Sequence, residues 1–212
     1  ELATYSPDLL KKEFGVYGVQ LWYHANGVDE SNVHVPYKPK SKGLGNSQVL
    51  PRDYVKQQEI ELVLSEMAEQ VAIRLRAIRK KTTTVSISIG YSRFEESTSF
   101  RGQMKIEPTN QTEELQKYVI SLFRKKYNGG AVRSISVFYS SFVDKNITML
   151  SLFDDPEEIL KKERLQTAID AIRSQFGFTT LQKANSLTSA SRSIARSKLV
   201  GGHSAGGLDG LK

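Results

Sequence analysis

Hydroxyl, amide and cationic side chains alternate with apolar ones along three stretches of this sequence. They are Thr84, Ser86 and Ser88 in the first stretch, Arg101, Gln103 and Lys105 in the second, and Ser134, Ser136 and Ser140 in the third. Hydroxyl and backbone N–H groups donate hydrogen bonds to phosphate oxygens, and Arg and Lys supply the countercharge. The pattern, interrupted by a single acid at Glu107, predicts a surface for a polyanion. An ordinary solvated sheet face is the alternative.

Side chains that could carry catalysis or hold a metal do not cluster in the sequence. The chain has no cysteine, and His24, His34 and His203 have no acid or second histidine at ligand spacing. Asp154 and Asp155 are adjacent carboxylates, but in front of Pro156 they are better placed to cap a helix. A Ser-His-Asp set, a phosphate loop and a dinucleotide fingerprint are missing. We therefore expect a binding function without a metal site or cofactor.

The positive charge is gathered in groups. The 212 residues include 30 Lys and Arg against 23 Asp and Glu, which gives a net charge of +7. The groups lie within Lys38–Lys42, Arg74–Lys81, Arg124–Lys126 and Lys183–Lys198. Complementarity to helix dipoles can account for the second and third groups, but the last lies in a Ser/Ala-rich stretch without such a helix end.

From the sequence pattern we expect neither a secretory leader nor a membrane segment. No apolar run approaches the roughly 20 residues that span a bilayer, and no basic-then-apolar stretch opens the sequence. We expect a cytoplasmic protein with no membrane partner. Because the chain starts at Glu1 rather than Met, we also expect it to be part of a longer protein.

Apolar spacing predicts short helices, a linker and a larger domain. Two short helices are expected within 6–27, and residues 35–45, rich in proline, glycine and lysine, read as an extended basic linker. Steps of three and four between Ile60 and Ile78 predict a long amphipathic helix over 53–81, and a second helix is expected over 110–128. A period of two predicts strands at 83–91, 99–107 and 132–142, and residues 46–50 can add an opening strand.

The order β-α-β-β-α-β predicts an α+β fold, in which a four-stranded antiparallel sheet carries two helices on one face. We expect this domain at 46–145, after a helical piece at 1–34 and the linker at 35–45. The other face of the sheet is left uncovered, and the polar side chains described above lie on it. Residues 146–212 would hold an apolar segment at Met149–Phe153, a helix over Pro156–Phe176, and a mobile, low-complexity basic tail after Gly177.

Motifs across nearly the whole chain resemble the Y-family translesion DNA polymerases. Phe14-Gly15, Gly18, Leu21, Ala25, Gly27, Asp29 and Val33 are similar to the stretch that closes the thumb in that family. Val71 to Arg76, followed by Thr84 to Phe94, resembles the first helix and next strand of its little-finger domain. Arg192-Ser-Ile-Ala and Gly201-Gly-His203 resemble the UmuC/ImpB/MucB branch, in particular UV-damage repair members from Gram-positive bacteria.

The resemblance implies a DNA-gripping piece of a polymerase rather than a catalyst. In this family the catalytic carboxylates and magnesium ions lie in a palm domain that precedes the thumb, and nothing in this sequence corresponds to it. The little finger lays its open sheet beside double-stranded primer-template DNA and contacts mainly phosphates. The positions that match are Lys42, Gly43, Ser86, Ser88, Arg101, Gln103, Lys105, Arg133, Ser134 and Ser136. Many family members have a second arginine where this chain has Ser134.

The family also carries a short sliding-clamp-binding peptide of the form Q-L-S-L-F. Met149, Leu150, Ser151, Leu152 and Phe153 match it at four of five positions, with Met149 in place of glutamine. Leu152 and Phe153 would be the anchors in an apolar pocket; burial against the same chain is the alternative. Two functions stay open. One is the DNA-binding module of a translesion polymerase, and the other is a protein-interaction module that recruits a sliding clamp or a regulatory subunit.

Overall fold

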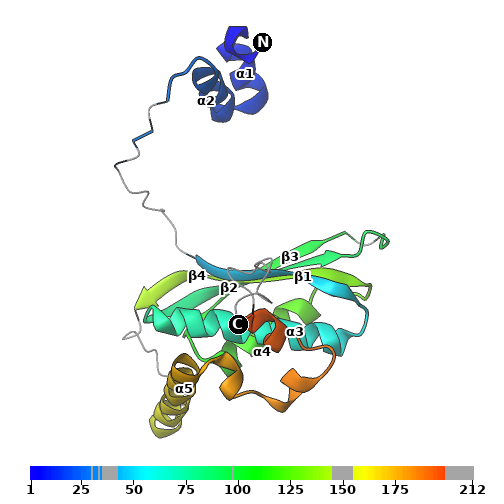
Figure 1. Cartoon of the computed structure of the whole chain (residues 1–212), viewed down its shortest axis with the longest axis vertical. Coiled ribbons are helices and arrows are strands. Elements are labelled where there is room, and N and C mark those ends of the chain that lie inside the picture. The colour runs from blue at the N-terminus through cyan, green and yellow to red at the C-terminus, as the bar shows by residue number, and fades with distance from the viewer. Residues whose placement is uncertain (30, 33, 35–42, 97, 145–154, 199–212) are drawn as a thin grey trace, which may run out of the picture. The chain divides into compact units, whose positions relative to one another are not determined.

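The computed structural model describes residues 1–29, 31–32, 34, 43–96, 98–144 and 155–198 (Figure 1). Its contacts divide the chain into two units, Glu1–Lys40 and Ser41–Lys212. Lys42 and the segment Met149–Phe153, both predicted to bind partners, lie outside the described residues.

The first unit is a pair of short helices. After the 3-10 turn η1 (Leu2–Thr4) come α1 (Pro7–Phe14) and α2 (Val16–Ala25), as the sequence predicts. Leu10 is the buried apolar residue between them. The helices pack so closely that a Cβ atom at position 18 would lie 2.1 Å from the Leu10 carbonyl oxygen, a clash that only glycine avoids.

The second unit, which we call the sheet unit, is built on an antiparallel sheet. Its elements are β1 (Gly43–Tyr54), α3 (Gln57–Ala77), β2 (Lys80–Tyr91), β3 (Phe100–Thr109), α4 (Thr112–Arg124) and β4 (Val132–Asp144). The strand order is β1-β4-β2-β3, and each neighbouring pair is antiparallel. The crossover β1-α3-β2 therefore straddles β4, and β3-α4-β4 straddles β2. The predicted α+β class and β-α-β-β-α-β order are confirmed.

Several element boundaries differ from the prediction by a few residues: β1 begins at Gly43, inside the predicted linker, and the boundary between β1 and α3 also moves. The first strand runs to Tyr54 and the long helix begins at Gln57, whereas helical spacing suggested a start near Asp53. Tyr54 is buried and pairs with Val132 of β4 beyond a shift in register. Burial of the Tyr54 ring and pairing with β4 thus hold this stretch extended against its local helical pattern.

The core lies between the sheet and the two helices, which Figure 1 shows on one side of the sheet. Leu64, Met67 and Leu75 of α3 are fully buried against Ile135 and Tyr139 of β4. The Tyr139 hydroxyl donates to the Ala68 carbonyl oxygen at 3.0 Å, and burial raises the pKa of Tyr139. Alternate residues of each strand enter this core, so the residues between them face the opposite side.

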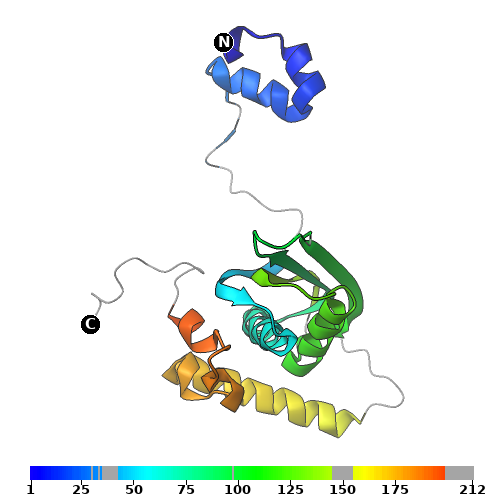
Figure 2. The same cartoon turned by 90° about the vertical axis from the view of Figure 1, so that its right-hand side faces the viewer.

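The C-terminal region packs back onto the helical side of this unit (Figure 2). It comprises α5 (Pro156–Phe176), the 3-10 turns η2 (Phe178–Thr180) and η3 (Ala184–Leu187), and α6 (Ser193–Ser197). The start of α5 is as predicted, because the Asp155 carboxylate accepts from the Glu157 N–H. The expectation of a mobile tail after Gly177 is wrong for residues 178–198. We call residues 178–198 the C-terminal strap.

Polar contacts hold this strap in place. The Tyr54 hydroxyl donates to the Ala190 carbonyl oxygen at 3.0 Å. The Glu66 carboxylate on α3 accepts from the Ser191 hydroxyl and the Arg192 N–H, while burial raises the pKa of Glu66. The Arg196 side chain donates to residues of both α3 and β1, as described below. The strap is therefore part of the folded domain.

Candidate nucleic-acid interface

The face of the sheet opposite the helices carries the polar residues that the sequence singles out. The pairing registers align them in rows that cross all four strands from β1 to β3. One row is Ser47, Ser136, Ser88 and Arg101; the next is Gly45, Phe138, Ser86 and Gln103; a third is Gly43, Ser140, Thr84 and Lys105. These rows contain no acid. We call this surface the open face.

The hydroxyl groups of the open face line a shallow hollow of about 570 Å³. Ser47, Ser86, Ser88 and Ser136 line it together with Arg101, Gln103 and Phe138. The Ser47 and Ser136 hydroxyls are joined by a hydrogen bond of 2.6 Å across the β1–β4 pair. Thr84 lies in the third row but is only 3% exposed, so its hydroxyl contributes little to the surface.

The free positive charge of the open face lies on the edge strand β3. Arg101 and Lys105 are exposed, and neither forms an ion pair with another described residue. Gly102 between Arg101 and Gln103 faces α4, close to Leu122, which shows that its two neighbours point to the other side. The Lys126 ammonium also reaches this strand and donates to the Arg101 carbonyl oxygen at 2.7 Å. The edge therefore offers cations that are available to phosphate.

Of the two candidate residues at the start of β4, Arg133 is placed differently from the rest. Arg133 falls within a register shift between β2 and β4, and its guanidinium lies 3.5 Å from the Asp53 carboxylate. Its charge is partly compensated within the chain. Ser134 does lie on the open face, opposite Gly90 and Val49.

Phe138 is a residue of the open face that the sequence reasoning missed. It is 45% exposed, and its ring lies across Gly45 on the neighbouring strand. The signal was available, because strict alternation from Ile135 puts position 138 on the same side as Ser134 and Ser136. From the sequence, only the serines on this side of β4 were considered, and position 138 was passed over.

Three arginines outside the open face are engaged within the fold. Arg76 forms a bidentate ion pair with Asp170 of α5, and Arg74 donates to the Gly45 carbonyl oxygen at 3.0 Å. Arg196, in the strap, is buried and donates to Gln48 and Gln70 at 2.6 and 2.9 Å. Burial lowers the pKa of Arg196. These arginines join elements rather than present charge.

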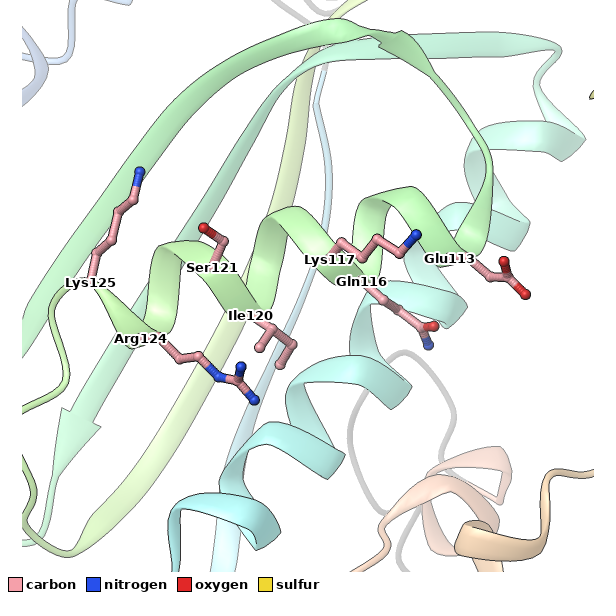
Figure 3. Close-up of a pocket in the computed structure, with 7 residues that line it drawn as sticks. All are labelled: Glu113, Gln116, Lys117, Ile120, Ser121, Arg124 and Lys125. Carbon is pink, nitrogen blue, oxygen red and sulfur yellow. The ribbon is translucent and has the colours of Figure 1, made fainter. Parts of the chain in front are cut away.

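A second hollow, of about 680 Å³, lies along the outer side of α4 (Figure 3). Its side chains include Glu113, Lys117 and Lys125, so both signs of charge are present. Arg124 there is paired with Glu61 of α3, and the hydrogen bonds from that guanidinium lower the pKa of Glu61. This hollow lacks the acid-free character of the open face.

The described residues show neither a metal-binding cluster nor a membrane-spanning helix. Within the described ranges, no three His, Asp or Glu side chains gather in a way that could hold a metal ion. No described helix has the length and apolar character needed to cross a membrane.

Comparison with known proteins identifies a family and several relatives that this chain resembles. Residues 41–152 match the impB/mucB/samB family C-terminal domain. The chain is 39% identical over 204 residues to the putative UV-damage repair protein UvrX of Bacillus subtilis, covering 96% of this chain and 49% of that protein. It is 38% identical over 204 residues to DNA polymerase IV 2 of the same organism, covering 95% and 49%. It is 42% identical over 130 residues to the DNA repair protein homolog YobH, also of B. subtilis, covering 61% and 60%. The chain thus spans about half the length of the first two relatives.

Proposed function

Because the chain belongs to the impB/mucB/samB family, we propose that its sheet unit is the DNA-gripping, little-finger domain of an error-prone translesion DNA polymerase. The open face would lie along primer-template DNA and hold its phosphates. The observation that carries this proposal is the acid-free set of rows, in which serine hydroxyls run from β1 to Arg101 and Lys105 on β3, two cations that have no ion-pair partner among the described residues. In this role the chain binds DNA, and the polymerase chemistry belongs to another part of the protein.

Phosphate contacts of this kind position a duplex without reading its sequence. Hydroxyl groups and a few long cations can meet any sugar-phosphate backbone, and the short serine side chains let the backbone approach the sheet. We therefore expect weak binding to any duplex, with little preference among sequences.

Duplex binding by the whole chain should fall steeply as salt rises. If Arg101, Lys105 and Lys126 each neutralise one phosphate, counterion release predicts that affinity drops roughly 40-fold between about 50 and 200 mM salt. Fluorescence anisotropy with a labelled duplex of random sequence measures this. Affinity that is absent at low salt, or the same at both salt concentrations, would contradict the proposal.

We further propose that the segment Met149–Phe153 recruits a sliding clamp. The support is its match to the Q-L-S-L-F form at four of five positions and its place in the sequence between β4 and α5. A sheet unit that grips DNA and a peptide that docks on a clamp are compatible roles. If clamp binding occurred without DNA binding, the chain would instead be a protein-interaction module.

Changing Leu152 and Phe153 to alanine should abolish recovery of the chain on an immobilised sliding clamp and leave duplex affinity unchanged. The two apolar anchors would be lost, while the open face stays intact. In the opposite direction, Met149→Gln should strengthen clamp binding, by roughly 5- to 150-fold if it pairs a buried polar group of the clamp pocket. Equal recovery of the wild-type chain and the double variant would refute clamp docking at this segment.

A further inference from the structure

Phe138 puts an aromatic ring in the middle of a surface made otherwise of hydroxyl, amide and cationic groups. We propose that Phe138 stacks on an unpaired base, so that the open face also binds single-stranded DNA. This inference rests on the proposed function, since both assign nucleic acid to the same face. It adds a contact to a base where the proposed duplex contacts are to phosphates alone.

The ring occupies a position that the neighbouring strand leaves free for it. A Cβ atom at Gly45 would lie 2.0 Å from Cδ1 of Phe138, so glycine at this position is what allows the ring to lie across β1. Ser136 precedes it by two residues on the same strand, and Ser86 lies opposite it on β2. The ring is packed on one side and 45% exposed at the edge of the hollow.

The groups around the ring suit a stacked base and the phosphates of the strand that carries it. Aromatic rings on open four-stranded sheets stack on unpaired bases in other nucleic-acid-binding domains. Gln103 lies in the same row as Phe138 and offers an amide that can donate to and accept from a base edge. Arg101 and Lys105 are two residues to either side of Gln103, roughly 14 Å apart along the strand, and can meet phosphates further along the bound strand on either side of the stacked base.

Base stacking favours a single strand over a duplex as the ligand that contacts the Phe138 ring. In a duplex the faces of the bases are stacked on one another, so a ring beside the backbone meets only sugar edges. An unpaired base has a free face, and stacking on an aromatic side chain tolerates every base type. The hollow has one cation, Arg101, and no acid in its lining, which suits an anionic strand.

The test compares a short oligothymidine strand with a blunt duplex of equal length by fluorescence anisotropy, on the whole chain. Phe138→Ala should weaken oligothymidine binding by roughly 5- to 150-fold, the range for loss of one stacked base, and weaken duplex binding by less than about 2-fold. The slope of affinity against salt should not change, because no charge is removed. Phe138→Trp should keep the affinity.

Two further variants separate stacking from packing. Phe138→Leu keeps an apolar side chain over Gly45 but has no aromatic face, so it should lose oligothymidine affinity as the alanine variant does. Val49→Ala removes another apolar side chain exposed on the same face and should have no effect. Thermal unfolding checks that each variant is folded.

The outcomes are distinguishable from failure of the proposed function. Equal losses on single strand and duplex, full affinity in Phe138→Leu, or no loss in Phe138→Ala would overturn the stacking role while leaving phosphate binding in place. A wild-type chain that binds neither ligand at low salt would overturn the proposed function itself.

Discussion

Replacing Arg173 with alanine should lower the free energy of unfolding of the sheet unit by about 3 kcal/mol. The Arg173 guanidinium donates to the Glu69 carboxylate at 2.8 Å and to the Leu181 carbonyl oxygen at 3.0 Å. The two charged side chains are only 8% and 11% exposed. Removing one partner of a buried pair leaves the other charge without compensation, which costs roughly 3–5 kcal/mol. The Lys183 ammonium, 3.4 Å from Glu69, puts the expected loss at the lower end of that range.

Urea unfolding followed by circular dichroism measures this loss. Arg164→Ala, at an exposed position of the same helix, is the control and should change stability by less than about 0.5 kcal/mol. If Arg173→Ala were as stable as the wild-type chain, the buried contact between α5 and α3 would not contribute to the stability of the domain. A simultaneous change of Arg173 to Met and Glu69 to Leu should recover much of the stability, because neither charge is then left buried.

Reversing the charge of the two exposed cations of the open face, with Arg101→Glu and Lys105→Glu together, should reduce duplex affinity at least about 60-fold at 0.1 M salt. Each phosphate contact contributes about 8-fold at this salt concentration by counterion release, so two lost contacts account for that factor. Repulsion between the new carboxylates and phosphate adds to it. The salt dependence should also become much shallower. Anisotropy titrations at several salt concentrations measure both effects.

A matched pair controls for net charge. Lys161 and Arg164 are exposed on α5, which contacts α3 on the helical side of the sheet unit. Changing both to glutamate alters the total charge by the same amount and should leave duplex affinity within about 2- to 3-fold, since exposed charges beyond a Debye length are largely screened. Similar losses in both double variants would mean that overall charge, and not the open face, controls binding.

Local sequence patterns determined the elements of the sheet unit and the side of the sheet on which the serines lie. A period of two is a property of the strand itself, so Ser86, Ser88 and Ser136 could be assigned to one face before any packing was known. The same holds for the long helix, whose apolar spacing is set within its own turns. Phe138 obeyed the same rule and was missed only because the strand was interpreted as purely polar on that side.

Tertiary structure alone decided the roles of the arginines and the C-terminal strap. Residues 178–198 have no periodicity, and they are held by contacts such as that of Tyr54 with Ala190, which are 136 positions apart in the chain. Arg133 lies at a register shift and next to Asp53. The buried Arg196 side chain donates to Gln48 of the edge strand β1. Such contacts depend on which surfaces the fold brings together. Periodicity reports only how a segment is oriented in its own helix or strand, so it could predict the open face but not which charges would remain free on it.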